Sequence, residues 1–272
     1  LHGMGQEDVD LPTPIPAQAR EGMSRLARSR MGQELVLALC WMGAHTAVER
    51  AVFRGLHLET TEPENPMIAL FERLDLAQPS LSEVKAAADR EDWAAAAEAL
   101  MRHFRGRFIV PMPSKISTGT LEEANKALEN RFRSCGSSEF FELHTDFEWH
   151  QNAIADKEWL LHLQWHHILR TLVEAGAVHK DSRYTQKAVD LIRDWIPANF
   201  PGSPWSWRTL EVSLRAMNWT TILPYLVNFD GFAPDDLVSM LFILSEHLES
   251  LLPPERFHSG HNFGTTESKA LL

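Results

Sequence analysis

The chain has 272 residues, only two cysteines and a net charge of −11 at pH 7. A negative protein is repelled by polyanions, so this charge argues against nucleic-acid binding and requires a locally basic site for any acidic ligand. No apolar run is long enough to span a bilayer, so no membrane insertion is expected. The two cysteines, Cys40 and Cys135, neither require nor exclude a disulfide.

The first part of the chain predicts an extended lead-in followed by helices. Residues 1–16 are rich in proline and polar side chains and predict no packed structure. The rest, residues 17–272, is expected to form one helical domain. Within it, apolar side chains recur at helical spacing between residues 17 and 58, which indicates a core-facing pair of helices.

The middle of the chain predicts shorter elements. Residues 80–83 have the form of a capping box, which predicts a helix running to about residue 90. A second helix is expected to begin at Asp92-Trp93 and to end near residue 105. Residues 121–132 predict a short helix, and residues 140–149 predict short extended pieces.

From Lys157 onward the helical pattern is clearer. One helix face is predicted by the spacing of Leu161, Trp165, Ile168 and Leu172, and Gly176 is expected to end that helix. Further helices are then predicted from Asp181 or Ser182 to Pro197, from Arg208 to Leu226, and from Pro234 onward. Helices joined by short connections, without strand alternation, predict an all-α fold: an (α/α) toroid of antiparallel hairpins or an irregular bundle.

The helix expected after residue 208 carries a polar stripe. Glu211, Arg215 and Asn218 stand at i, i+4 and i+7, and Trp205-Ser206-Trp207 come just before them. The stripe is either a surface Glu–Arg pair or the polar lining of a cleft, and the residues alone leave both readings open. The chain has nine tryptophans against two tyrosines. Most of these tryptophans are expected in the core, although tryptophan is also the side chain that stacks on sugar rings.

Metal and cofactor signals are weak. His162 and His166 stand four residues apart and could bind zinc with a third ligand, but no glutamate occupies the metalloprotease position between them. The favoured interpretation is two partly buried or surface histidines without a metal. The sequence shows no glycine-rich phosphate loop, no nucleophile elbow and no cysteine-rich zinc pattern, so no cofactor is predicted.

The end of the chain concentrates polar groups around glycines. Asn262 lies between His261 and Gly264, and Thr265 or Thr266 is expected to cap a following helix. Amide and imidazole groups beside a helix start suit the recognition of a carboxylate, whereas the alternative is a capped turn with incidental histidines. Because this helix is expected to continue past residue 272, we expect the chain to be a piece of a longer protein.

Three segments together resemble the heparinase II/III-like polysaccharide lyases and, through them, the related alginate lyases. Residues 207–215 look like the family's W-x-x-x-E-x-x-x-R helix, continued by Asn218-Trp219. Residues 181–184, followed by Asp194-Trp195, are similar to its helix after a D-x-x-Y turn. Residues 260–263, with Glu267, look like its G-N-H-x-x-x-E segment. Here histidine precedes the asparagine, and Phe263 stands in the usual histidine position.

The resemblance implies an incomplete α/α toroid followed by a β-sandwich domain. The whole protein would be a periplasmic or secreted enzyme that cleaves an acidic polysaccharide by β-elimination at a uronic acid. Asn262 would neutralise the uronate carboxylate and His261 would be a candidate base, while the family's tyrosine acid/base lies beyond residue 272. The substrate would be contacted by Trp205, Trp207, Glu211, Arg215 and Glu267. This chain alone would have little or no activity.

Two other functions stay open on the sequence. One is a non-catalytic helical carbohydrate-binding domain with the same toroid. The other is a toroid-type glycoside hydrolase, which would need Glu211 and Glu267 to face one cleft. Tyr184 and Tyr225 are expected to be packing residues rather than the acid/base.

Overall fold

The computed structural model describes residues 66–134, 137–143, 149, 156–199, 206–253 and 262–271, except the side chains of Lys157 and Asn262. The chain divides into two compact units, Leu1–Thr60 and Thr61–Leu272, and every described residue belongs to the second. The lead-in, the helical pair, Cys40 and Cys135 lie outside the described residues. The division into residues 1–16 and 17–272 therefore stays a prediction.

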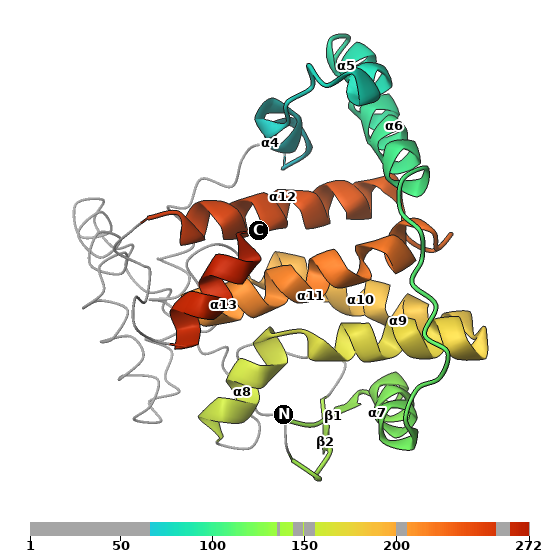
Figure 1. Cartoon of the computed structure of the whole chain (residues 1–272), viewed down its shortest axis with the longest axis vertical. Helices are drawn as coiled ribbons and strands as arrows, with labels where there is room; N and C mark the ends of the chain where they lie inside the picture. The colour runs from blue at the N-terminus through green and yellow to red at the C-terminus, as the bar shows by residue number, and fades with distance from the viewer. Residues whose placement is uncertain are drawn as a thin grey trace, which may run out of the picture. The chain divides into compact units, whose positions relative to one another are not determined.

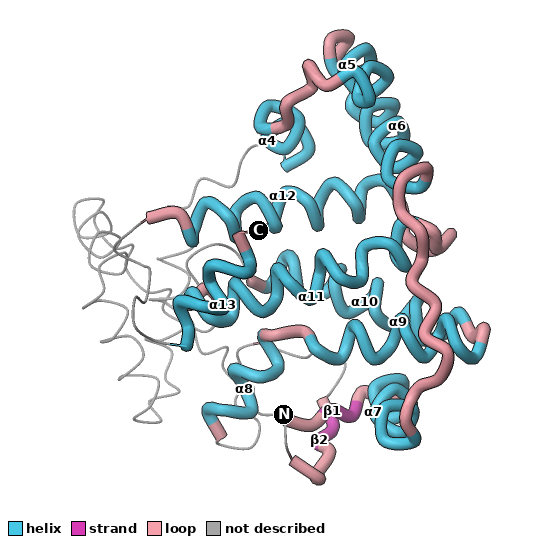
Figure 2. The backbone as a smooth tube through the Cα atoms, viewed as in Figure 1, coloured by secondary structure: helices cyan, strands magenta, loops and turns pink. Residues whose placement is uncertain are grey.

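Apart from two short strands, the regular elements in the described part of the chain are helices, which confirms the all-α class (Figures 1 and 2). Its earlier elements are α4 (Pro66–Arg73), the 3-10 helix η1 (Pro79–Leu81), α5 (Ser82–Ala88), α6 (Trp93–Arg105), α7 (Thr118–Leu128), and the antiparallel strands β1 (Arg131–Phe132) and β2 (Phe141–Glu142). Its later elements are α8 (Lys157–Gln164), α9 (His167–His179), α10 (Ser182–Ala198), α11 (Thr209–Val227), α12 (Pro234–Leu251) and α13 (Asn262–Ala270). None of these described helices is both long enough and apolar enough to cross a membrane.

Several helices begin where local chemistry predicts. The Asp92 side chain accepts a hydrogen bond from the Ala95 amide at the start of α6, and Asp181 accepts one from the Arg183 amide at the start of α10. Caps of this kind stabilise a helix by about 0.5–2 kcal/mol. Pro234 is the first residue of α12, as expected. These starts confirm the predicted positions of α6, α10 and α12.

Helix α11 is the centre of the described unit. Successive helices joined by short turns, α9 with α10 and α11 with α12, run antiparallel (Figure 1). Helix α11 packs against α6, α8, α9, α10, α12 and α13. A helix surrounded in this way is buried on most of its faces, including Val212, Ala216, Trp219, Ile222 and Leu226. Each fully buried aliphatic side chain contributes roughly 1.5–3 kcal/mol.

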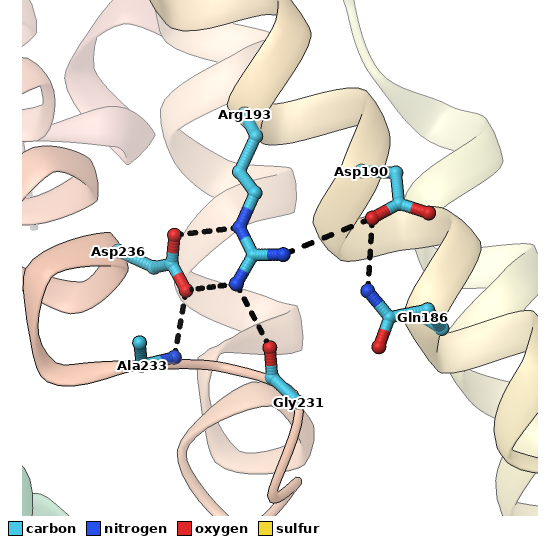
Figure 3. Close-up of polar contacts among 6 residues, drawn as sticks. All are labelled: Gln186, Asp190, Arg193, Gly231, Ala233 and Asp236. Atoms are coloured by element: carbon cyan, nitrogen blue, oxygen red, sulfur yellow. Dashed lines mark hydrogen bonds and ion pairs between the residues drawn. The ribbon is translucent and has the colours of Figure 1, made fainter.

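An arginine joins α10 to the start of α12 (Figure 3). Arg193 donates through Nε and Nη2 to the two carboxylate oxygens of Asp236, at 2.8 and 2.6 Å, and through Nη2 to the Gly231 carbonyl at 2.9 Å. The Ala233 amide donates to Asp236 at 2.6 Å, and Asp190 lies 3.9 Å from the guanidinium. The same carboxylate therefore caps α12 and holds α10.

The expected single helix through Trp165 is wrong: the structure has two helices with a break between them. Helix α8 ends at Gln164 and α9 begins at His167, because His166 has a left-handed backbone with φ of 59°. This conformation costs a residue with a side chain roughly 1–3 kcal/mol. The break removes Trp165 from the helix face that Leu161, Ile168 and Leu172 were predicted to share with it.

Other predicted boundaries shift because local signals compete. The capping box at residues 80–83 does not form, since a 3-10 helix occupies Pro79–Leu81 and α5 starts without a side-chain cap. Helix α7 ends at Leu128, and Phe132 lies in β1. Helix α9 runs past Gly176 to His179, and Lys180 takes the left-handed conformation. Helix α13 begins at Asn262, so Thr265 and Thr266 lie inside it and neither caps its start as predicted.

Candidate functional site

All four predicted substrate-contacting side chains that the structure describes are buried. The exposed fractions of Trp207, Glu211, Arg215 and Glu267 are 6%, 0%, 0% and 2%. The contacts that these four side chains make in the structure are with other protein groups. Their direct contact with substrate stays a prediction. Trp205 and His261 lie outside the described residues. Asn262 is the first residue of α13, and its side chain is also outside them.

The guanidinium of Arg215 forms hydrogen bonds with three separate segments of the chain. Its Nη1 donates to the Gln164 carbonyl at the end of α8 (3.0 Å), and its Nη2 donates to the Ser206 carbonyl just before α11 (2.7 Å). Nη2 also lies 2.9 Å from Nε2 of His247 on α12, and the guanidinium stacks 4.2 Å from the Trp195 ring centre. We call Gln164, Trp195, Ser206, Arg215 and His247 the Arg215 cluster.

A layer of aromatic rings surrounds this cluster. Trp195 donates to the Gln164 side chain at 2.9 Å, and that side chain donates to the Trp149 carbonyl at 2.6 Å. Trp219 donates to Nδ1 of His166 at 2.9 Å and packs edge-on against Trp195. The prediction that most tryptophans lie in the core is confirmed, because five of the nine are buried: Trp149, Trp159, Trp195, Trp207 and Trp219.

The two buried histidines are neutral. Burial lowers the pKa of both His166 and His247 well below the ordinary value of 6.5, and the charge of Arg215 lowers both further. His166 accepts the Trp219 N–H at Nδ1, so its proton is on Nε2, whereas His247 faces the guanidinium with Nε2, so its proton is on Nδ1. Burial lowers the pKa of Arg215 to about 9, which leaves it protonated at neutral pH.

Of the two readings left open for the stripe, the surface pair of Glu211 with Arg215 is excluded, because both side chains are buried. Its ion pair is with Arg208, 3.4 Å away in the preceding turn, and Trp165 donates Nε1 to its other oxygen at 3.4 Å. Burial raises the pKa of Glu211, and Arg208 acts against that rise. The buried carboxylate therefore lies between the first turn of α11 and the α8–α9 break.

Several buried polar atoms at this end of α11 make no hydrogen bond within the described residues: His166 Nε2, Asn199 Oδ1, Ser206 Oγ, Glu211 Oε2 and His247 Nδ1. Sequence reasoning missed Gln164, Ser206 and His247 as members of the cluster. His247 alone had a usable signal, since it stands three residues after Leu244 and four before Leu251, on an otherwise apolar helix face.

Helix α13 packs along α11 and closes the same part of the core. Gly264 and Glu267 on α13 are buried, and Ala270 packs against Trp207, Val212 and Leu251. The segment that begins with Asn262 is thereby joined to the segment from Trp207 to Arg215. Because Trp195 of the third segment stacks on Arg215, all three segments singled out in the sequence come into contact.

The two histidines that could have bound zinc, His162 and His166, face different neighbours, because the backbone of His166 is left-handed. His162 bonds through Nδ1 to the Ser134 hydroxyl at 2.5 Å, while His166 faces the tryptophans of the core. Within the described residues, no three histidine, cysteine, aspartate or glutamate side chains come together as a metal site. The two tyrosines are packing residues as predicted: Tyr184 donates to Asn125, and Tyr225 is buried.

The chain is similar to known lyases in sequence and in fold. Heparin-sulfate lyases of Bacteroides stercoris and Bacteroides thetaiotaomicron are both 26% identical to it, over 211 and 223 residues; the matches cover 67% and 74% of this chain and 32% of each relative. The crystal structure of heparan sulfate lyase HepC from Pedobacter heparinus matches with a TM-score of 0.66 and 20% identity, covering 75% of this chain and 34% of that one.

The chain thus spans about a third of the length of the curated relatives it matches. The likeness to HepC, with the helix hairpins described above, confirms the incomplete α/α toroid. The model of one family, described as Heparinase II/III N-terminus, matches residues 70–272, which include the Arg215 cluster, α11 and α13. The chain therefore belongs to the heparinase II/III N-terminus family.

Proposed function

We propose that the chain is the toroid part of a polysaccharide lyase that cleaves a uronic-acid-containing polysaccharide by β-elimination. The observation that carries this proposal is the packing of α13, which begins at Asn262, along α11, which continues the Trp207–Arg215 segment. The family match and the heparin-sulfate lyases among the relatives support it. The proposed site lies where these two helices meet.

The proposed reaction needs two kinds of group. A donor must neutralise the uronate carboxylate so that charge can develop there when a base removes the proton on C5. The electron pair of that C–H bond forms the C4–C5 double bond, the C4–O4 bond breaks, and an acid protonates the departing O4. Asn262 is assigned the carboxylate-neutralising amide, and His261 is a candidate base.

The proposal extends to the whole protein. We expect an acidic polysaccharide as substrate, a β-sandwich domain following the toroid, no cofactor, and a periplasmic or secreted location. We also expect residues 1–272 alone to show little or no eliminase turnover. The glycoside hydrolase alternative gains no support, because Glu211 and Glu267 are both buried and offer no accessible pair of carboxylates.

The test is Asn262→Ala in the protein as its gene encodes it, with turnover followed by the ultraviolet absorbance of the unsaturated uronate. Removing a donor that stabilises developing charge should lower kcat by about 10²–10³-fold with little change in the Kd for substrate. Thr265→Ala, at an exposed position on the same helix, is the matched control and should keep its activity. Unchanged turnover in Asn262→Ala would overturn the role given to Asn262, and no turnover by the unmodified protein would favour the non-catalytic carbohydrate-binding alternative.

A further inference from the structure

The break between α8 and α9 places an aromatic side chain at the surface. His166 is buried, and among the described non-glycine residues with positive φ, which are Glu91, Asn130, His166 and Lys180, it is the one inside the core. Trp219 and Trp195 hold its imidazole, so the surrounding core maintains the left-handed backbone. In consequence Trp165, next to it, is only partly buried.

Trp165 is held in place on several sides. Its carbonyl accepts a hydrogen bond from the Asn218 amide at 2.7 Å, and its indole N–H faces Glu211 at 3.4 Å. The His162 ring centre lies 4.1 Å from the Trp165 ring centre, and the His167 ring packs edge-on at 5.7 Å. A fixed aromatic ring loses little conformational entropy when a ligand packs on it.

The rim of this ring carries polar groups. Asn218 Nδ2 lies 3.3 Å from His167 Nδ1, so that nitrogen accepts and the proton of the neutral ring is on Nε2. His167 is exposed, while His162 and Asn218 are partly buried. We call His162, Trp165, His167 and Asn218 the Trp165 platform. It combines a partly exposed aromatic surface with imidazole and amide groups. Among the described tryptophans, every other one except Trp93 is buried.

This combination fits a pyranose ring. The C–H face of a sugar is apolar and packs on an indole, while its hydroxyl and carboxylate groups need hydrogen-bond donors at the edge. The platform also adjoins the proposed site, because α11, which carries Glu211 and Asn218, packs against α8, α9 and α13. No residue of the platform was assigned to substrate from the sequence, where Trp165 was expected in the core.

We propose that the Trp165 platform is a binding subsite for one sugar ring of a uronate-containing oligosaccharide. The assignment rests on the proposed function for the identity of the polymer. Trp165 packs on the sugar face, and His162 and His167 bond its polar edge. Asn218 is a positioning residue, since it holds the Trp165 carbonyl and the His167 ring.

The experiment measures the Kd of a heparan sulfate hexasaccharide by titration calorimetry on the protein as its gene encodes it. Trp165→Ala should raise Kd about tenfold or more, and His167→Ala, which removes an exposed ring, about threefold. Trp93→Ala is the matched control: Trp93 is another partly exposed tryptophan, stacked on Phe71 of α4, and its removal should leave Kd unchanged. Circular dichroism checks that each variant is folded.

The outcomes separate the subsite from the catalytic proposal. Wild-type Kd in folded Trp165→Ala and His167→Ala, or no binding of the hexasaccharide by the unmodified protein, overturns the subsite. If Trp165→Ala does not fold, His167→Ala decides alone. Weaker binding in these variants, together with no eliminase turnover by the unmodified protein, upholds the subsite and defeats the lyase assignment. Loss of turnover in Asn262→Ala with an unaltered Kd in the platform variants supports the lyase assignment and overturns the subsite.

Discussion

Two arginines tie α12 to its neighbours in opposite ways. Arg193 reaches α12 from α10, keeps 43% of its side chain exposed, and bonds a carboxylate with both arms of its guanidinium. Arg215 reaches α12 from α11, is fully buried, and bonds two carbonyls and a neutral imidazole. The first is a conventional ion pair near water, and the second is a charge enclosed by tryptophans.

The difference teaches where an arginine matters most. When an exposed pair is broken, water replaces the lost bonds, so such pairs contribute about 0.2–1 kcal/mol. When Arg215 is removed, the carbonyls of Gln164 and Ser206 lose their donors inside the protein, and each unsatisfied group costs about 1–3 kcal/mol. The two arginines form a similar number of hydrogen bonds, so the difference in their contribution to stability comes from burial.

The largest expected effect is that of Arg215→Ala. It should lower the free energy of unfolding by about 3–5 kcal/mol, because it leaves buried acceptors unpaired and a cavity against Trp195. Urea unfolding followed by tryptophan fluorescence measures the change. Arg215→Lys keeps the charge but lacks the planar fork, so its loss should be intermediate. A loss below about 1 kcal/mol in Arg215→Ala would erase the contrast with Arg193.

The second-largest expected effect is a fall in the free energy of unfolding at acidic pH, caused by the histidines around Arg215. The pKa values of His166 and His247 are well below 6.5 in the folded protein, so below pH 6.5 the unfolded chain binds protons that the folded one does not. Stability is full above pH 6.5 and falls as the pH drops, by about 1.4 kcal/mol per pH unit for each imidazole. Glu211 opposes this fall, because its raised pKa lets the folded state bind the extra proton.

Urea unfolding at about pH 7.5 and about pH 5.5 should therefore show a net loss of about 1–3 kcal/mol. His247→Gln keeps an acceptor for Arg215 without a titrating group, and it should remove roughly half of the histidine contribution to that loss. An equal pH dependence in His247→Gln and the unmodified protein would mean that His247 does not titrate in this way.

The smallest expected effect is that of Arg193→Ala, about 1 kcal/mol, since Asp236 is only 14% exposed but keeps its cap on Ala233. Unfolding in low and high salt measures it, and salt should reduce the difference. Arg170→Ala, which breaks an exposed pair with Glu174 within α9, is the control and should cost a few tenths of a kcal/mol. A loss in Arg193→Ala as large as that in Arg215→Ala would contradict the role given to burial.

Local sequence predicted much of the fold and little of the site. The starts of α6, α10 and α12 follow from Asp92, Asp181 and Pro234, each acting within its own first turn. The break at His166 depends on a hydrogen bond from Trp219, 53 residues later, so a local pattern of apolar residues could not reveal it. That missed break is also why Trp165 was assigned to the core.

The polar stripe on α11 was recognised, but its environment was not. Spacing placed Glu211, Arg215 and Asn218 on one helix, and spacing carries no information about which neighbours cover them. The structure buries Glu211 and Arg215 and leaves Asn218 at the edge. Gln164 and Ser206 contribute main-chain carbonyls to Arg215, and the identity of a residue does not report the use of its backbone.

The left-handed backbone at position 166 restricts which amino acids evolution can place there. Glycine would adopt the conformation without strain, but it would leave the Trp219 N–H without its acceptor. Aspartate tolerates the backbone, yet it would bring an uncompensated charge into the core. Histidine and asparagine satisfy both conditions, since each accepts a hydrogen bond while neutral and is comparatively frequent at positive φ. We expect other members of the family that keep the break to carry one of these two residues at the position of His166.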